Sequence, residues 1–251
     1  MASLQVDAIL FDIDGTLIDE SRSYREAIRR TAEFLLRRSV TMDEVDAVKA
    51  LPGFNNDWDA TWALVGKRIH GSIYRPDAAD RGSYAYRRLR SIFQTYYLGH
   101  RLWSQISGEE PPFQWEEPLM ELETPLITLQ TLERLSPFTL GIATSRPRSE
   151  ALMALRQHGF ERSFPSSAVV AMEDAPREKP HPAPLLRLVR ILGCTAPVYV
   201  GDSINDALTA SSAGIPFVCV GPARLAEKVR YHLADVNEIV DLCSLRPRVG
   251  V

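Results

Sequence analysis

The sequence has few cysteines, and nothing in their placement pairs them. Its 251 residues include three, Cys194, Cys219 and Cys243, which lie far apart and share no metal-ligand spacing. An odd, scattered set is typical of reduced thiols in the cytoplasm and argues against a secreted protein held together by disulfides. We therefore expect a cytoplasmic protein that buries its core without covalent cross-links, for which this length suffices.

Long apolar runs and an excess of positive charge are also absent. No apolar run approaches the roughly 18 residues that a membrane-spanning helix needs, and residues 1–7 lack the basic and apolar segments of a signal peptide. The net charge of -3 provides no basic field for nucleic acid. We therefore expect neither membrane nor nucleic acid as a partner, and basic clusters such as residues 87–90 are explained as charged helix faces.

What the sequence does contain is an alternation of strand and helix patterns, mostly in its second half. The patterns predict strands at residues 6–11, 139–144, 168–172, 197–200 and 215–220, and a short strand at 238–242. They predict helices at residues 126–135, with Pro125 at the helix start, and at 148–158, 182–192, 205–213 and 222–231. Strands that alternate with helices favour an α/β fold with a mostly parallel sheet covered on both faces.

Between the first strand and the others lies a long stretch with helical patterns only. The helical evidence consists of periodic stretches and capping sequences at residues 21–36, 41–44, 55–57 and 83–106, with a loop expected at 76–82. A structureless insertion of this length is implausible in a compact protein. We expect a helical domain at residues 18–125, inserted into an α/β core that residues 1–17 and 126–251 form.

Polar side chains gather where the predicted strands end. They are Asp12 and Asp14, Thr144 to Arg146, Glu173 and Asp174 followed by Lys179, and Asp202 to Asp206. Because ligands of open parallel sheets bind outside the carboxyl ends of the strands, we expect these side chains to form one site. By itself, the pair Asp12 and Asp14 fits an ordinary turn or a calcium loop as well as it fits a catalytic site. The polar residues at the other strand ends favour the catalytic site.

This set of residues suits phosphoryl transfer. Clustered aspartates are hard oxygen ligands for Mg²⁺, and the cation would offset their mutual repulsion. Thr144 and the backbone N–H groups at the next helix start can bind phosphate oxygens, and Lys179 supplies a positive charge for the transferring group. A carboxylate nucleophile would form a covalent aspartyl-phosphate and divide the reaction into two steps.

Four segments resemble the motifs of the haloacid dehalogenase-like (HAD) superfamily in order and in strand-end placement. They are Asp12-Ile13-Asp14-Gly15-Thr16, Thr144, Lys179-Pro180-His181-Pro182, and Gly201-Asp202-Ser203 with Asp206. The resemblance implies a Rossmann-like three-layer sandwich. The helical insertion is similar to the inserted cap domain of the phosphoglycolate phosphatase and β-phosphoglucomutase-like branch.

The resemblance also implies a role for each motif residue. Asp12 would be the nucleophile and Asp14 the general acid and then the general base. Thr144 would bind phosphate, and Lys179 would neutralise the charge on Asp12 and the phosphate.

The implied Mg²⁺ site would be formed by Asp12, the backbone carbonyl of Asp14, and Asp202. Asp206 would bind the metal directly or through water. Asp206 has an alternative role from its position alone, since an acidic residue there can simply cap the next helix.

Substrate contacts are the least constrained part of the site. Ser145 and Arg146 next to Thr144, Arg22 after the first motif, and Asn55 and Asp57 in the helical insertion are candidates. Each has a structural alternative, because such residues also close turns, cap helices or cover solvated helix faces.

The sequence therefore predicts a Mg²⁺-dependent phosphomonoester hydrolase that acts on a small phosphorylated metabolite. A phosphomutase with the same site and a non-catalytic relative that binds phosphate ligands are the alternatives. Phosphoglycolate and sugar phosphates are open as substrates. Histidinol phosphate is open too, because the stretch from Gly53 to Asp59 resembles the cap of relatives associated with histidine biosynthesis.

Overall fold

A computed structural model of the chain describes residues 4–54, 56–221 and 229–245. It divides into two compact units, one of Met1–Asp19 with Thr124–Val251 and one of Glu20–Glu123. Among the described residues, every helix is too short or too polar to cross a lipid bilayer. That the first unit is a catalytic core and the second a cap domain stays a prediction.

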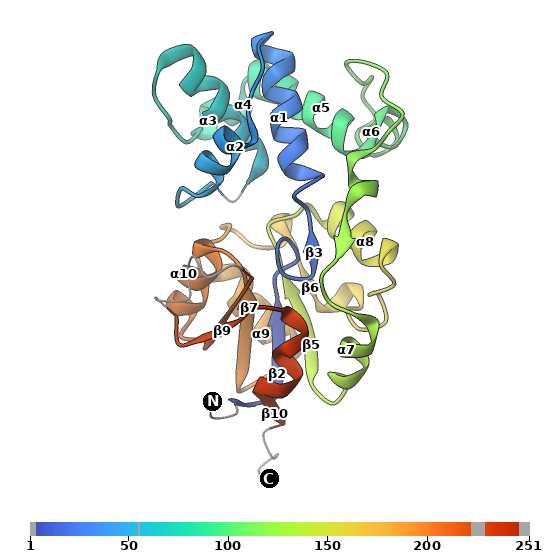
Figure 1. Cartoon of the computed structure of the whole chain (residues 1–251), viewed down its shortest axis with the longest axis vertical. Coiled ribbons are helices and arrows are strands. Elements are labelled where there is room, and N and C mark those ends of the chain that lie inside the picture. The colour runs from blue at the N-terminus through green and yellow to red at the C-terminus, as the bar shows by residue number, and fades with distance from the viewer. Residues whose placement is uncertain (1–3, 55, 222–228, 246–251) are drawn as a thin grey trace. The chain divides into compact units, whose positions relative to one another are not determined.

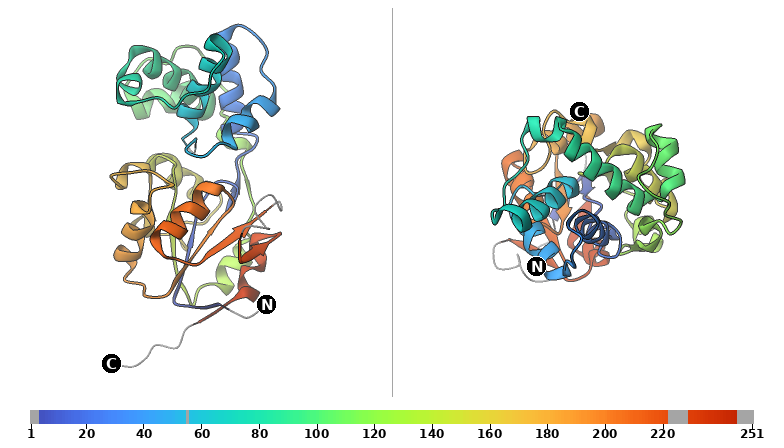
Figure 2. Two further views of the ribbon diagram at one scale, coloured as in Figure 1. Left: turned by 90° about the vertical axis from the view of Figure 1, so that its left-hand side faces the viewer. Right: turned by 90° about the horizontal axis from the view of Figure 1, so that it is seen from above.

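A parallel sheet forms the centre of the first unit (Figures 1 and 2). Its strands, in spatial order, are β6 (Val169–Val170), β5 (Thr139–Ala143), β2 (Ala8–Phe11), β7 (Pro197–Gly201), β8 (Phe217–Val220) and β9 (Tyr231–Leu233). Every pairing between neighbours is parallel. The central strand β2 is buried along its whole length, as a strand covered on both faces should be.

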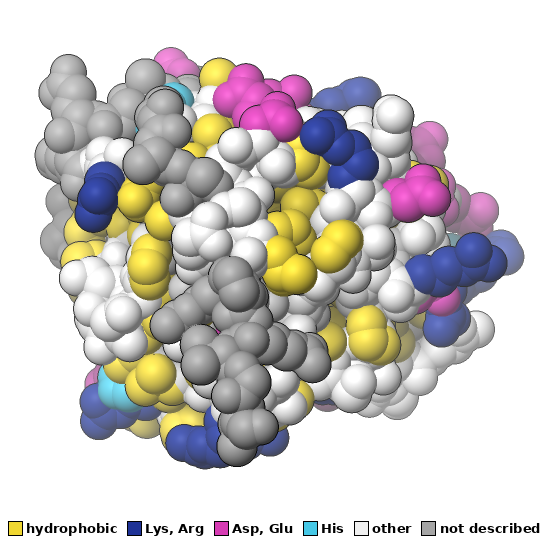
Figure 3. Space-filling model, turned by 90° about the horizontal axis from the view of Figure 1, so that it is seen from below, with side chains coloured by type: hydrophobic (Ala, Val, Ile, Leu, Met, Phe, Trp, Pro, Cys, Tyr) yellow, Lys and Arg dark blue, Asp and Glu magenta, His cyan; other side chains and the backbone are white. Residues whose placement is uncertain are grey.

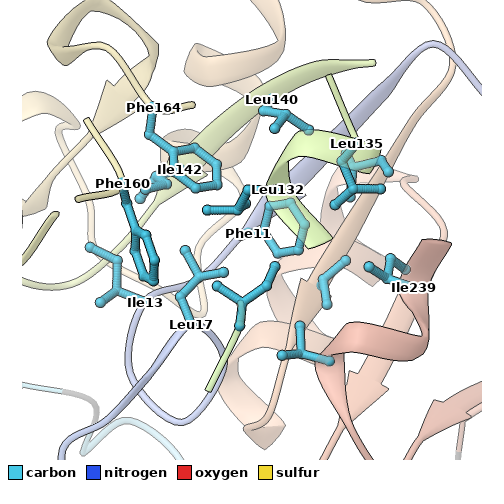
Figure 4. Close-up of a cluster of buried hydrophobic side chains, with 14 of the residues drawn as sticks. Phe11, Ile13, Leu17, Leu132, Leu135, Leu140, Ile142, Phe160, Phe164 and Ile239 are labelled. Carbon is cyan, nitrogen blue, oxygen red and sulfur yellow. The ribbon is translucent and has the colours of Figure 1, made fainter. Parts of the chain in front are cut away.

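Helices cover both faces of this sheet, which confirms the predicted α/β sandwich. They are α7 (Leu129–Arg134), α8 (Arg148–Gln157), α9 (Ala183–Leu192), α10 (Ile204–Ala213) and α11 (Ile239–Leu242), with short 3₁₀ turns at Ser166–Ala168, Met172–Asp174 and Val236–Glu238. Phe11 packs on one face with Leu132 of α7 and Ile239 of α11 (Figure 4). Its neighbour Leu10 packs on the opposite face with Leu185 of α9, because successive strand residues point to opposite sides.

Two short strand pairs flank the sheet. β1 (Leu4–Val6) pairs in parallel with β10 (Cys243–Leu245), and β3 (Ile18–Asp19) pairs in antiparallel fashion with β4 (Thr124–Pro125). On the face that Figure 3 shows, acidic and basic side chains are interspersed, in keeping with the small net charge of the chain.

The prediction of a helix at residues 126–135 was wrong at its start. Thr124 and Pro125 belong to strand β4, and α7 begins only after Thr128. The Thr128 side chain accepts a hydrogen bond from the backbone N–H of Thr131 at 3.1 Å. An N-terminal capping threonine therefore sets the helix start, and the proline had suggested a start that is too early.

The predicted strand at residues 238–242 was also wrong. This segment is a 3₁₀ turn followed by α11, and the strand β10 comes directly after it. Ile239 and Leu242 are both buried, and their spacing of three residues places them on one face of a helix.

Three other strand and helix predictions need adjustment. Asp7 interrupts the first strand, and its carboxylate accepts hydrogen bonds from the backbone N–H groups of Thr195 and Ala196. The strand predicted at 168–172 is limited to Val169–Val170. The helix predicted at 222–231 lies mostly outside the described residues, and its last residue, Tyr231, starts strand β9.

The second unit is helical, as predicted. Its helices are α1 (Tyr24–Leu36), α2 (Met42–Lys49), α3 (Asp57–His70), α4 (Ala78–Gly82), α5 (Tyr84–Leu98) and α6 (His100–Ser107), followed by a 3₁₀ turn at Leu119–Leu122. Helix α1 packs against α3 and α5, and the rings of Tyr24 and Tyr97 stack with their centroids 4.2 Å apart. The capping box of Thr41 and Glu44 and the cap by Asn56 are both present.

Two predictions for the helical unit were wrong. Residues 76–82 are not all loop, because Asp77 and Asp80 form a capping box that starts α4. Residues 83–106 are not one helix, because Gly99 (φ 78°, ψ 157°) separates α5 from α6. That backbone conformation is readily available only to glycine, so the residue ends the helix although the apolar period continues.

Candidate active site

Asp12 is the first residue after β2, at the middle of the carboxyl edge of the sheet. β2 lies between β5 and β7, which are followed by Thr144 and by Asp202. The backbone N–H of Asp12 donates to the carbonyl of Val200 at 2.9 Å, so the strand hydrogen bonding extends to this residue. The topology therefore brings the three predicted groups to one edge.

Lys179 lies buried between two carboxylates. Its Nζ is 2.8 Å from Oδ1 of Asp12 and 2.7 Å from Oδ1 of Asp206, and its side chain is 1% exposed. The contact with Asp206 is a hydrogen bond. Oδ1 of Asp12 meets the ammonium as an ion pair, and no residue in the described part of the chain donates a well-aligned hydrogen bond to it. Asp12 is thus next to the positive charge while its oxygen is still open to a further partner.

The carboxylate of Asp206 is fully occupied by protein donors. Oδ1 accepts from Lys179 and, at 2.9 Å, from the hydroxyl of Tyr199, while Oδ2 accepts from the backbone N–H and the hydroxyl of Ser203. Ser203 and Asp206 form the capping box of α10. The two roles considered for Asp206, helix cap and site residue, therefore coincide in one side chain.

Asp12, Asp202 and Asp206 form the acidic cluster of the site. One oxygen from each lies within 4.8 Å of the other two. Gly15 (φ +67°) makes room for this arrangement, because a Cβ at that position would lie 2.2 Å from Oδ2 of Asp202. Three carboxylates and one ammonium leave an excess of two negative charges, so the cluster fits a divalent, oxygen-seeking cation such as Mg²⁺.

The cluster perturbs the ionisation of its members. Burial raises the pKa of Asp12 to about 7; Lys179 opposes this shift, and the charges of Asp206 and Asp14 add to it. Burial acts to lower the pKa of Lys179, but the two carboxylates outweigh burial and the pKa is raised. The ammonium is therefore charged, and a cation beside Asp12 would favour its ionised form.

Asp14 is paired with Arg146. Nε and Nη2 of Arg146 lie 2.9 Å and 2.5 Å from Oδ1 of Asp14. The arginine side chain is 1% exposed, whereas that of Asp14 is 28% exposed. The guanidinium of Arg146 thus binds the predicted acid–base residue, and a contact of Arg146 with substrate stays a prediction.

Thr144 and Ser145 begin the loop that leads from β5 to α8. Thr144 is buried, and its Oγ1 accepts from the backbone N–H of Arg146 at 3.2 Å. This bond uses the oxygen as an acceptor and leaves the hydroxyl proton for another partner. Ser145 is half-buried. A contact of either residue with phosphate stays a prediction.

Glu173 and Asp174 do not belong to the acidic cluster. Glu173 accepts from the backbone N–H of Arg148 at 2.9 Å, and Asp174 pairs with the guanidinium of the same arginine. Their contacts with Arg148 hold the loop before Lys179 against the start of α8.

The substrate contacts predicted outside the sheet belong to the helical unit. Asp57 is the first residue of α3 and forms an ion pair with Lys49 at 2.7 Å. Arg22 is exposed just before α1, and Asn55 lies outside the described residues. Their contact with substrate stays a prediction.

The gathered motifs agree with a comparison of the whole chain with known families. A family model described as haloacid dehalogenase-like hydrolase matches residues 6–214. The chain belongs to this family of hydrolases. The sequence resemblance is thereby confirmed.

Relatives of this HAD-like hydrolase include phosphatases that match it along nearly its full length. A phosphoglycolate phosphatase of Yersinia pestis is 26% identical, and the match covers 96% of each chain. The solved structure of the phosphatase Tt82 of Thermococcus thioreducens is 29% identical, with a TM-score of 0.69 over 93% of this chain and 97% of the other. Family and relatives together make the chain a phosphatase of the HAD type.

A third relative is a longer protein. An imidazoleglycerol-phosphate dehydratase of Phytophthora nicotianae is 32% identical over 211 residues, which is 83% of this chain and 42% of that protein. The HAD-like chain thus spans less than half of the relative's length.

Two contacts of the HAD site carry no sequence signal. Tyr199 has the appearance of an ordinary core residue in the apolar run of β7, yet its hydroxyl contacts both Lys179 and Asp206. The pairing of Asp14 with Arg146 joins residues from two separate loops. A pairing of this kind depends on the orientation of both side chains, which residue spacing does not determine.

Proposed function

We propose that the enzyme hydrolyses phosphomonoesters of small metabolites with the help of Mg²⁺ and through an aspartyl-phosphate on Asp12. The observation that carries the proposal is the buried ammonium of Lys179 beside Asp12, with Asp202 and Asp206 adjacent. A nucleophilic carboxylate needs such a cation, because the phosphate it attacks is itself negatively charged.

In the first step an oxygen of Asp12 bonds to phosphorus as the ester P–O bond breaks. Asp14 donates a proton to the departing oxygen, which leaves as an alcohol. Lys179 offsets the negative charge that Asp12 and the phosphoryl group bring together, and the hydroxyl of Thr144 binds a phosphoryl oxygen.

In the second step water attacks the phosphorus of the aspartyl-phosphate. Asp14, now ionised, takes a proton from that water, and the bond between phosphorus and the Asp12 oxygen breaks. Inorganic phosphate leaves and Asp12 is regenerated. Arg146 orients the Asp14 carboxylate, since two of its nitrogens bind one oxygen of that group.

Asp12, Asp202 and the backbone carbonyl of Asp14 would hold the Mg²⁺. Asp206 would take part through water, because its two oxygens already accept four hydrogen bonds. When bound, the cation would supply positive charge at the phosphoryl oxygens.

The helical unit would choose the substrate, with Asn55, Asp57 and Arg22 as contacts. The names of two relatives suggest which esters to test. One is a phosphoglycolate phosphatase, and the other is named for an imidazole-bearing phosphate ester. We propose a panel that contains phosphoglycolate, histidinol phosphate and sugar phosphates. The cytoplasmic location, suggested by the free cysteines, is part of the same proposal.

Phosphate release from this panel with Mg²⁺ tests the function. The wild type should release phosphate steadily from at least one ester, Asp12→Asn should not, and Asp241→Asn, which changes an exposed carboxylate, should match the wild type. Turnover that survives in Asp12→Asn would contradict the proposal. An isomerised sugar phosphate without phosphate release would point instead to a phosphomutase.

A further inference from the structure

Tyr199 is a fully buried tyrosine in the middle of β7. Its ring packs with Leu10, Leu185 and Ala210 between the sheet and the helices α9 and α10. Packing of this kind would be served equally well by phenylalanine, so the hydroxyl is the part of the side chain that core packing does not explain.

The hydroxyl of Tyr199 has three polar neighbours among the residues that the structure describes. It lies 3.1 Å from Nζ of Lys179, 2.9 Å from Oδ1 of Asp206 and 3.0 Å from the carbonyl oxygen of Ala143. A phenol can accept from the ammonium while its single proton is shared between the oxygens of Asp206 and Ala143. The group therefore bridges the loop that carries Lys179, the start of α10 and the end of β5.

The contacts of Lys179 show what the hydroxyl does. The ammonium is held by two hydrogen bonds, to Tyr199 and to Asp206, and faces Asp12 as an ion pair. A lysine side chain is a flexible four-carbon chain, so one hydrogen bond fixes the distance to one partner but leaves rotation about it. The second bond, to a hydroxyl on a rigid strand, removes that rotation.

We propose that Tyr199 is a positioning residue that holds the ammonium of Lys179 against Asp12. Ala143, whose carbonyl contacts the hydroxyl, immediately precedes Thr144, so the same hydroxyl ties Lys179 to the strand that delivers the proposed phosphate ligand. The inference rests on the proposed function, since it assigns Tyr199 to the lysine of that reaction.

Tyr199→Phe tests the inference, because it removes one oxygen and keeps the ring. We expect kcat to fall about tenfold or more, equivalent to about 1.4 kcal/mol in the barrier, with KM changed less than threefold or so. A lysine that is misplaced when charge moves weakens the transition state more than the bound substrate.

Tyr86→Phe is the matched control. Tyr86 is also buried, and its hydroxyl donates to the buried carboxylate of Asp59 at 2.6 Å within the helical unit. We expect both variants to lose thermal stability, but only Tyr199→Phe to lose kcat. A kcat for Tyr199→Phe within twofold or so of the wild type, or equal losses of kcat in both variants, would overturn the inference.

A double-mutant cycle separates positioning from a general structural effect. In a Lys179→Met background, Tyr199→Phe should not lower the residual rate of phosphate release, measured at high enzyme concentration over long incubation, because there is no ammonium left to position. A loss of the same size in both backgrounds would overturn the inference. The proposed function and the role of Tyr199 can be refuted separately. Turnover that survives in Asp12→Asn would contradict the proposed function. An inactive Asp12→Asn together with a fully active Tyr199→Phe would contradict only the role of Tyr199.

Discussion

Replacing Lys179 with methionine should destabilise the metal-free enzyme much more than the loss of an exposed ion pair. The ammonium lies 2.8 Å and 2.7 Å from two buried carboxylate oxygens. Each attraction is worth roughly 6 kcal/mol at an effective dielectric constant of about 20, and desolvation of the charges offsets much of it. Removal of one partner of a buried pair leaves the other charges uncompensated, so we expect a loss of about 3–5 kcal/mol.

The loss should depend on pH. Lys179 opposes the raised pKa of Asp12, so in the variant this pKa is raised further. A carboxyl whose pKa is higher in the folded than in the unfolded state stabilises the protein only while it is protonated, and that contribution is lost as the pH rises through the window between the two values. The destabilisation should therefore be larger at pH 8 than at pH 5.5.

Urea unfolding in EDTA measures this effect. All four tryptophans lie in the helical unit, at positions 58, 62, 103 and 115, so their fluorescence follows that unit while far-ultraviolet circular dichroism follows the whole chain. Lys49→Met is the control, because Nζ of Lys49 lies 2.7 Å from Oδ1 of Asp57 but the two side chains are 18% and 17% exposed. We expect this variant to lose about 1 kcal/mol or less of unfolding free energy. Equal losses in the two variants, or a Lys179→Met loss independent of pH, would refute the reasoning.

Three further predictions concern the acidic cluster and the helical unit. Gly15→Ala should raise the Mg²⁺ concentration needed for half-maximal activity, because the new Cβ collides with Asp202. Gly214→Ala is the control: its φ is similarly positive, but no atom of the described residues lies within 4 Å of the added Cβ, so it should keep the wild-type Mg²⁺ requirement. Equal Mg²⁺ requirements in the two variants would contradict the prediction. In wild-type enzyme without metal, the melting temperature should fall as the pH rises from about 5 to 8, since the raised pKa of Asp12 favours its protonated form in the folded state. Mg²⁺ should raise the melting temperature most at pH 8. An equal stabilisation by Mg²⁺ at pH 5 and pH 8 would contradict this prediction. Asp59→Ala should destabilise the helical unit by about 3–5 kcal/mol, because this fully buried carboxylate binds Arg81 and Tyr86. Urea unfolding followed by tryptophan fluorescence measures the loss. A loss below about 1 kcal/mol would show that the network is dispensable.

The sequence was most informative where local chemistry determines structure. Buried apolar runs predicted the strands, and the rule that ligands bind at the carboxyl ends predicted that Asp12, Lys179 and Asp202 would meet. The capping box of Thr41 and Glu44 is equally local, since its hydrogen bonds join residues three apart. Features of this kind can be read from the sequence because spacing alone fixes their geometry.

Other features depend on contacts between distant segments. Thr124 and Pro125 form a strand because Ile18 and Asp19 lie beside them, whereas their own sequence suggested a helix start. The stretch from Gly53 to Asp59 fits either a substrate-contacting loop or ordinary helix capping beside a core residue, and substrate contact by Asn55 and Asp57 stays a prediction. What the sequence could not show is that the buried carboxylate of Asp59 binds Arg81 and the hydroxyl of Tyr86, because both partners lie more than 20 residues away.

The central claim is that Asp12 becomes phosphorylated during turnover. Rapid quenching of the enzyme with a substrate from the panel, followed by borohydride reduction and mass spectrometry of the peptides, measures this directly, because an aspartyl-phosphate is reduced to homoserine whereas a free aspartate is not. We predict homoserine at position 12, dependent on substrate and Mg²⁺. Unmodified Asp12 during active turnover, or homoserine at another aspartate such as Asp14 or Asp202, would contradict the proposed mechanism.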